Sequence, residues 1–299
     1  MGEITDALRR ARVEREAAQQ APPAEAAARG ALRPASAPGQ APMPATDPEP
    51  AQEPVAISRQ LVGGWQARAV HIGRPHAAAE RFRHLAVRVR RELEARRGRL
   101  LLVASALRQE GKTVTSCNLA LALASMASER RIALIDLDLR RPSVASALLV
   151  RPAVGIEHVL RGEATLGSAR IPTELPTLDL YLASGPVRQA HELLAGATFR
   201  QVLAELSERY AVVVADTPPV LLVPDVPLIA PHVDGIMVVA RASRTAISNF
   251  RDMLGLLPRE KLLGGFLNEV RASLHATEYG YYLGKDAAED DEDESERDR

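Results

Sequence analysis

The stretch that decides the fold is LLLVASALRQEGKTVTSCN, residues 100–118. Its apolar run 100–104 has the composition of a strand buried on both faces, and a short loop then leads into Gly-Lys-Thr at 111–113. Residues 112–127 continue with a helical composition. Strand, loop and helix in this order are the context that a phosphate-binding loop requires. The sequence therefore predicts a nucleotide-binding α/β domain.

The Gly-Lys-Thr segment carries the chemistry of this loop. Phosphate binding needs backbone N–H groups at a helix N-terminus, a lysine that reaches the β and γ oxygens, and a hydroxyl for Mg²⁺. Gly111, Lys112 and Thr113 supply these three elements, with Val114 next to them in the nucleotide-binding segment. The complete pattern would have glycine at position 106, where this chain has Ala106. We predict that the segment binds ATP together with Mg²⁺.

The alternation of apolar runs and helical stretches continues to residue 267. Further strands are expected at 132–135, 178–182, 211–215, 235–240 and 262–267, and further helices near Ser143 and at 199–209 and 246–256. Several of these runs are nearly continuous, as in strands that are covered on both faces. We predict a doubly wound, mostly parallel sheet with helices on both faces, in a P-loop NTPase fold with a deviant Walker motif.

Three aspartates stand at the ends of predicted strands. Asp136 and Asp138 follow one apolar run, and Asp216 follows another. In open α/β sheets the ligand crevice lies at the carboxyl ends of the strands, where the P-loop also lies. One such carboxylate can support Mg²⁺ through water while another accepts the proton of an attacking hydroxyl. A single aspartate of this kind is usually a helix cap, but three beside a P-loop indicate a catalytic site.

Composition divides the chain into four parts. We expect a short amphipathic helix at 1–19, a disordered linker rich in proline and alanine at 20–76, the P-loop domain at 77–278, and a tyrosine cluster with an acidic disordered tail at 279–299. The domain opens with a basic helix that Gly98 is expected to end. Its arginines alternate with glutamates and no aromatic platform accompanies them, so we expect no nucleic acid partner.

Charge, cysteine usage and the lengths of the apolar runs indicate in which cellular compartment the protein works. Net charge is zero, yet residues 286–299 hold nine acids against two arginines, so the rest of the chain is basic. The single cysteine, Cys117, permits no internal disulfide and no cysteine cluster for zinc. No apolar run reaches the roughly 18 to 20 residues that span a bilayer, and the N-terminus lacks the apolar core of a secretory signal. We expect a cytoplasmic protein that reaches the membrane only through a partner.

Together these residues resemble the bacterial tyrosine kinases, the BY-kinases. The GKT loop, IDLDLRRP (135–142) and VVADTPPV (213–220) are similar to the Walker A, A′ and B motifs of that family. The resemblance covers about residues 78–282 and includes GIEHVLRGEATL (155–166), ELL (192–194), DGIMVV (234–239) and GGFLNEV (264–270). The N-terminal ITDALRRA resembles the opening helix of autokinases from exosortase-type polysaccharide systems.

The resemblance implies a role for each site residue. Lys112 and Thr113 would bind phosphate and Mg²⁺, and Asp136 would be the base that activates the hydroxyl. Asp138 and Asp216 would support the metal and its waters. The implied activity is an ATP- and Mg²⁺-dependent protein-tyrosine autokinase that regulates capsule or exopolysaccharide polymerisation and export.

The same resemblance assigns the phosphoacceptors and the partners. Family members usually end in a tyrosine cluster that a neighbouring subunit phosphorylates, and here Tyr279, Tyr281 and Tyr282 form such a cluster. The implied partners are a membrane polysaccharide co-polymerase of the chain-length-determinant type and further copies of this chain. A membrane co-polymerase as partner would recruit the protein to the inner face of the plasma membrane.

The chain departs from the family pattern at two further places. Residues 107–110 read Leu-Arg-Gln-Glu where the family commonly has a proline-glycine pair, which predicts a less preorganised loop and lower activity. The E-x-x-R-x-x-R motif of the oligomerisation helix is matched at Glu80 and Arg83 but has Ala86 at its third position, which puts ring assembly in doubt unless arginines at 88 and 90 substitute.

Two other functions compete with the kinase. A partitioning ATPase of the ParA or MinD type would carry an additional lysine where Leu107 stands, and would lack the tyrosine cluster. A non-catalytic, ATP-binding scaffold of a polysaccharide co-polymerase is favoured by Arg108 and Gln109 in the loop. Phosphotyrosine formed with ATP and Mg²⁺ distinguishes the kinase from the scaffold.

Overall fold

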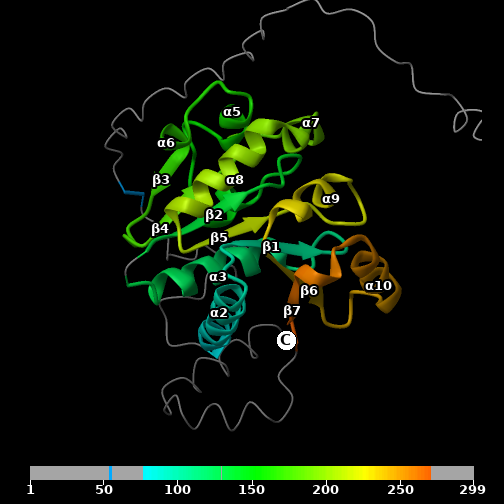
Figure 1. Ribbon diagram of the computed structural model, residues 1–299. Helices are drawn as coiled ribbons and strands as arrows, with labels where there is room; N and C mark the ends of the chain where they lie inside the picture. The colour runs from blue at the N-terminus through cyan, green and yellow to red at the C-terminus, as the bar shows by residue number, and fades with distance from the viewer. Residues whose placement is uncertain (1–53, 56–76, 129, 271–299) are drawn as a thin grey trace, which may run out of the picture. The chain divides into compact units, whose positions relative to one another are not determined.

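The computed structural model describes residues 54–55, 77–128 and 130–270 (Figure 1). All of them lie in the second of two units of the chain, Pro48–Arg299. The predicted helix at 1–19, nearly all of the linker at 20–76 and the tail at 279–299 lie outside the described residues.

Seven strands form one sheet in the order β3-β4-β2-β5-β1-β6-β7 within the described part of the chain. They are β1 (Leu100–Ser105), β2 (Ile132–Asp136), β3 (Arg170–Pro172), β4 (Leu178–Tyr181), β5 (Val212–Asp216), β6 (Gly235–Arg241) and β7 (Leu262–Asn268). All neighbouring pairs are parallel except β3 and β4. The predicted doubly wound, mostly parallel sheet is thus confirmed. The short antiparallel edge strand β3 was not predicted.

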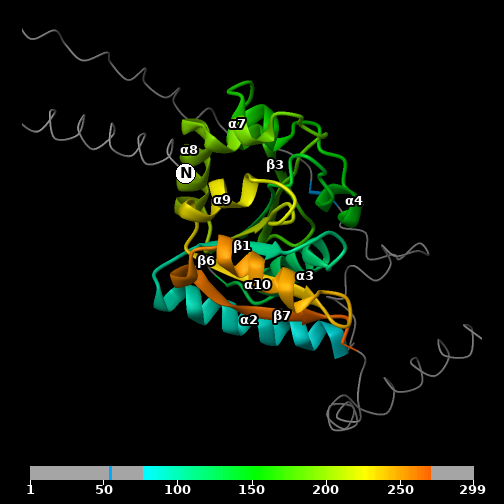
Figure 2. The same cartoon turned by 90° about the vertical axis from the view of Figure 1, so that its right-hand side faces the viewer.

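Helices cover both faces of the sheet, as predicted (Figures 1 and 2). One face carries α2 (Ala77–Ala95), α3 (Lys112–Ser125) and α4 (Val144–Leu148). The other carries α5 (Ile156–Leu160), α6 (Leu166–Ala169), α7 (Ala190–Ala195), α8 (Ala197–Arg209), α9 (Asp225–Ile229) and α10 (Ile247–Leu256). Two 3-10 turns, η2 (Ala230–His232) and η3 (Arg259–Lys261), precede β6 and β7.

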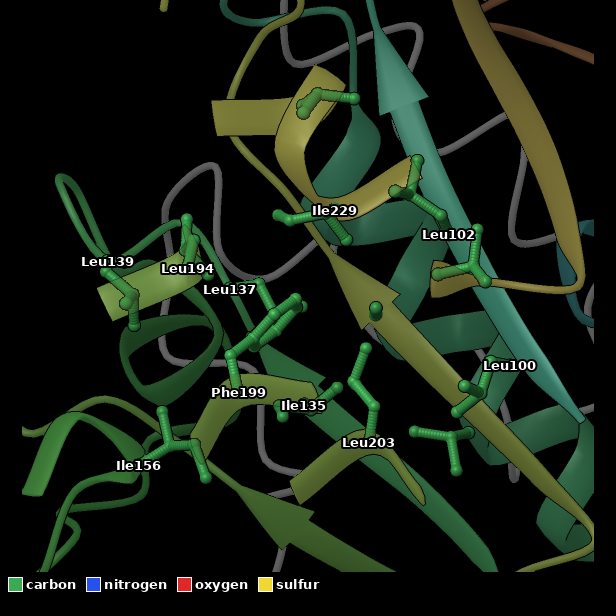
Figure 3. Packing of buried hydrophobic residues seen from close by; sticks show 14 of the residues in the cluster. Leu100, Leu102, Ile135, Leu137, Leu139, Ile156, Leu194, Phe199, Leu203 and Ile229 are labelled. Carbon is green, nitrogen blue, oxygen red and sulfur yellow. The ribbon is translucent and has the colours of Figure 1, made fainter. Parts of the chain in front are cut away.

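Strand β1 lies inside the sheet and contributes to two cores because its side chains alternate between the faces. Leu100 and Leu102 belong to the same cluster as Phe199 and Leu203 of α8 (Figure 3). Leu101 and its neighbour Val103 instead join the residues of α2 and α3. Each fully buried side chain of this size stabilises the fold by about 1.5–3 kcal/mol, so β1 holds the P-loop on a rigid base.

The basic helix α2 ends at Ala95, two residues earlier than predicted. Arg97, not Gly98, takes the left-handed conformation with φ 54°, and the Gly98 N–H donates to the carbonyl of Leu93 at 2.8 Å. Gly98 is required for another reason. A Cβ atom at this position would lie 2.4 Å from Cβ of Asp234, whose carboxylate accepts from two backbone N–H groups at the start of β1.

Candidate active site

The sheet order brings the P-loop and the three aspartates to one edge. Strand β5 lies between β1 and β2, and Asp136 and Asp216 are register neighbours at the ends of β2 and β5. The P-loop follows β1 directly, and parallel strands present their carboxyl ends at the same edge of the sheet. The structure therefore assembles the residues that the sequence predicted as a site.

The loop leads into α3 through a glycine that no other residue can replace without strain. Gly111 has φ 92° and lies directly before the first helical residue, Lys112. A Cβ at Gly111 would lie 1.8 Å from Nδ2 of Asn268. The glycine therefore permits both the left-handed turn and the close approach of β7. At Gln109 the chain also adopts positive φ, 61°, where glycine would be favoured.

Asp216 is fully buried and collects three side-chain donors from the start of α3. Its Oδ1 accepts from Nζ of Lys112 at 3.3 Å and from the hydroxyl of Ser116 at 3.0 Å, and its Oδ2 accepts from the hydroxyl of Thr113 at 2.7 Å. Lys112 is itself only 7% exposed. This cluster positions the lysine and the hydroxyl that the sequence assigned to phosphate and Mg²⁺.

Asp136 is also fully buried, and backbone N–H groups fix its carboxylate. Oδ1 accepts from Asp138 N at 3.1 Å, and Oδ2 accepts from the N–H groups of Ser143 and Val144 at 3.0 Å each. Burial and the negative charge of Asp216 raise the pKa of Asp136 from 3.8 to about 8, against the opposing effect of its backbone hydrogen bonds. With such a pKa the carboxyl is mostly protonated at neutral pH in the ligand-free protein, and a cation bound beside it would favour the ionised form that can act as a base.

Asp138 lies nearer the surface, with 7% of its area exposed. Burial raises its pKa, while the charge of Lys112 opposes that shift. Its Oδ1 accepts from the N–H of Arg141 at 3.1 Å, so backbone contacts hold this aspartate too. Asp138 thus keeps acceptor capacity for metal-bound waters.

The residues present fit an Mg²⁺ ion that arrives with a nucleotide. Across 77–128 and 130–270, no three His, Cys, Asp or Glu side chains form a cluster that would hold a metal alone. Nucleotide-bound Mg²⁺ requires only one or two protein oxygens besides phosphates and waters. The Thr113 hydroxyl, with Asp216 and Asp138 beside it, provides such a set. Val114, half-buried on the first turn of α3, offers only backbone atoms.

Sequence reasoning missed four polar residues at this edge. Ser116, one helical turn after Lys112, shares Asp216 with it, and the Ser143 hydroxyl lies 2.8 Å from that of Thr113. The side chain of Arg140 donates twice to the buried Asp225, at 2.7 and 2.9 Å, and so joins the Asp138 loop to α9. The spacing of Ser116 was a usable signal, whereas nothing in the sequence joins Arg140 to a residue 85 positions away.

The tyrosines of the chain fall into two groups. Tyr181 and Tyr210 are buried, their hydroxyls lie 2.9 Å apart, and Tyr210 also donates to Asp179 at 2.8 Å. The other three tyrosines of the five lie outside the described residues, in the predicted phosphoacceptor cluster.

A P-loop after a buried strand, with a paired lysine and three carboxylates at the same sheet edge, defines this protein as a member of the P-loop nucleotide-binding class. No protein-family model matches the chain. Tyrosine-protein kinase YwqD of Bacillus subtilis (strain 168) is 31% identical over 212 residues, which cover 70% of this chain and 87% of YwqD. The chain belongs to the family of bacterial tyrosine-protein kinases.

Other relatives and solved structures agree with this family. The succinoglycan biosynthesis transport protein ExoP of Rhizobium meliloti (strain 1021) is 32% identical over 216 residues, although the chain spans only 27% of its length. The solved VpsO kinase domain has a TM-score of 0.57 and 32% identity, covering 64% of this chain and 97% of that one. The Escherichia coli ETK kinase domain has a TM-score of 0.61 and 25% identity, covering 66% and 78%. The predicted family and P-loop fold are confirmed.

Among the described helices, none combines the length and the apolar character that a membrane span requires.

Proposed function

We propose that the protein is an ATP- and Mg²⁺-dependent tyrosine autokinase whose acceptors are Tyr279, Tyr281 and Tyr282 of a neighbouring copy. Family membership supports tyrosine as the acceptor, and the cluster around Asp216 supports a phosphate site. The observation that carries the choice of tyrosines is burial. Tyr181 and Tyr210 have 0% and 3% exposed area and hydrogen-bonded hydroxyls, so neither can reach another subunit's site without unfolding.

The chemistry follows from the residues at the sheet edge. In the reaction, the acceptor hydroxyl oxygen bonds to the γ-phosphorus of ATP, the bond from that phosphorus to the bridging oxygen breaks, and ADP leaves. Lys112 and the N–H groups at the start of α3 neutralise phosphate charge. Mg²⁺, when bound through Thr113 and the waters near Asp138 and Asp216, supplies charge stabilisation at the phosphates.

Asp136 receives the proton that the acceptor hydroxyl loses. Three backbone donors hold its carboxylate in one orientation, and the positive charge of a bound Mg²⁺ would lower the raised pKa and favour the ionised form that accepts the proton. Its Oδ1 has only one of these donors, so one lone pair stays available to a hydroxyl. Asp136 has no exposed area in the ligand-free protein, so residues around it have to move before an acceptor hydroxyl can reach it.

Regulation of polysaccharide assembly is proposed from the relatives. ExoP is named a succinoglycan biosynthesis transport protein, and it extends well beyond the region that this chain matches. We propose that a membrane co-polymerase activates this kinase and recruits it from the cytoplasm to the inner face of the membrane. Autophosphorylation that proceeds equally with and without the cytoplasmic segment of such a partner would contradict this regulation.

Oligomer formation through α2 is proposed with a modified contact surface. Glu80 and Arg83 form an ion pair on this helix, and Ala86 is fully buried against the sheet. An arginine at 86 would have to leave the core, so Ala86 serves packing here. Arg88 and Arg90 are exposed, and we propose them as cations for a neighbouring copy, although Arg90 already pairs with Glu94 at 3.1 Å.

The non-catalytic scaffold is the competing function, because Arg108 and Gln109 alter the loop. Incubation of the purified chain with Mg²⁺ and ATP, followed by mass spectrometry, separates the two. Phosphate on the three tail tyrosines is the expected result, and replacing all three by phenylalanine removes it. Nucleotide binding without phosphotyrosine would favour the scaffold, and phosphate mainly on Tyr181 or Tyr210 would refute the assignment of the acceptors.

A further inference from the structure

Two arginines, one at the end of β6 and one in the turn after it, hold the exposed part of the P-loop. Arg241 Nη1 donates to the carbonyl of Gln109 at 3.1 Å, and Arg244 Nη2 donates to the side-chain oxygen of the same residue at 2.8 Å. The left-handed conformation of Gln109 is unfavourable for a residue with a side chain, so contacts at both of its oxygens help to maintain it. The Arg244 contact is exposed and therefore contributes little.

The contact at Glu110 is buried and carries more weight. Glu110 is 2% exposed, and its Oε2 accepts from the N–H of Leu107 at 2.7 Å, which closes the loop on itself. Its Oε1 accepts from the hydroxyl of Thr245 at 2.5 Å, and that hydroxyl accepts from the N–H of Arg241 at 2.8 Å. A buried carboxylate that loses a donor is costly, so the loop conformation depends strongly on Thr245.

The same turn is joined to the end of β7, where the chain leaves toward the tyrosines. The side-chain amide of Asn268 donates to the carbonyl of Glu110 at 3.2 Å, and the Asn268 carbonyl accepts from Ala242 N at 2.9 Å. Arg241, which contacts the P-loop, also forms an ion pair with Glu269. One guanidinium thus touches both the P-loop and the residue directly after β7.

We propose that Arg241, Thr245 and Asn268 are positioning residues for the P-loop, and that the Arg241–Glu269 pair couples nucleotide binding to the start of the C-terminal segment. The P-loop lacks a proline-glycine pair, and contacts from residues that lie 132 to 158 positions further along the chain hold its conformation. A nucleotide that orders the P-loop then also orders residues 268–270. Linkage makes this coupling reciprocal. The factor by which bound nucleotide changes a neighbour's affinity for the C-terminal segment equals the factor by which that neighbour changes nucleotide affinity. The inference rests on the proposed function in that the site binds a nucleotide.

The test measures Mg–ADP affinity of the full chain by calorimetry in matched variants. Thr245→Val, which keeps the shape but removes the hydroxyl, is expected to weaken binding about tenfold. Thr245→Ser restores the hydroxyl and should return affinity to within about twofold of the wild-type value. Glu269→Ala removes a half-exposed ion pair and should weaken binding about two- to fivefold. Asp252→Ala removes an exposed acid on α10 and serves as the matched control, in which Mg–ADP affinity should equal that of the wild-type chain.

Hydrogen exchange supplies a readout that kinase activity does not affect. Mg–ADP should slow exchange at 109–111 and at 268–270 in the wild-type chain and in Asp252→Ala, but only at 109–111 in Glu269→Ala. Equal affinity of the wild-type chain and Thr245→Val, or equal protection of 268–270 in the wild-type chain and Glu269→Ala, would overturn the inference while leaving the proposed function intact. If the wild-type chain binds no Mg–ADP, the nucleotide site itself is wrong, and the inference falls with it.

Discussion

Replacement of Asp136 by alanine is expected to change the pH dependence of stability in a defined way. In the ligand-free protein this carboxyl has a pKa of about 8, against 3.8 for an ordinary aspartate, because it is buried beside Asp216. The unfolded chain releases the proton near pH 3.8, whereas the folded protein retains it to about pH 8. The stability contributed by the protonated carboxyl is therefore fully present below the lower pKa and is lost as pH rises through the higher one.

The magnitude follows from the shift. Each pH unit between the two pKa values corresponds to about 1.4 kcal/mol, so the contribution of Asp136 changes by about 4 kcal/mol between pH 5 and pH 8. At pH 5 the alanine variant should be less stable than the wild-type protein, because three backbone N–H groups lose an acceptor, at about 1 kcal/mol each. At pH 8 that difference should have vanished or reversed, because the variant no longer buries a charge next to Asp216.

Urea denaturation without Mg²⁺ or nucleotide measures this effect at pH 5, 6.5 and 8. The informative quantity is the difference in unfolding free energy between the wild-type protein and Asp136→Ala, because other titrating groups largely cancel in it. Asp252→Ala, which removes an exposed acid, should show a difference that stays nearly constant with pH. A constant difference for Asp136→Ala as well would refute a raised pKa at this residue.

Two further substitutions test the site and the loop. Asp216→Ala removes the shared acceptor of Lys112, Thr113 and Ser116 and should lower the rate of autophosphorylation by a factor of about 10² to 10⁴. A radiolabel assay measures this rate, and a near-native rate would show that the carboxylate has only a structural role. Gln109→Val places a β-branched residue at φ 61° and should cost about 1–2 kcal/mol in urea unfolding, whereas Gln109→Gly should be nearly neutral. Equal stability of the valine and glycine variants would mean that this left-handed conformation is not maintained.

The sequence predicted the parts of the fold whose signal is local. Strand β1, the P-loop and helix α3 follow one another within residues 100–125, and their order alone predicts the phosphate site. The aspartates at 136, 138 and 216 were predictable because strand ends in a parallel sheet meet at one edge. Strand β3 was missed because it has only three half-buried residues, Arg170–Pro172, one of them proline, which usually argues against a strand.

Contacts between distant segments could not be predicted in this way. Thr245 reaches Glu110 across 135 positions, and Asn268 reaches it across 158. No local pattern records such a pairing, because it depends on the order in which β1, β6 and β7 lie in the sheet. The left-handed residue at the end of α2 was misplaced for a similar reason. Gly98 is needed because Asp234, far along the chain, packs against it.

The measurement that tests the central claim most directly is anti-phosphotyrosine blotting of the purified chain and its Lys112→Met variant after incubation with Mg²⁺ and ATP. Methionine has a similar length but no charge, and Asp216 retains its two hydroxyl donors, so the variant should fold, as circular dichroism can verify. We expect phosphotyrosine on the wild-type protein and almost none on the variant. Equal phosphotyrosine on both proteins would contradict the assignment of this loop as the ATP site of a tyrosine kinase.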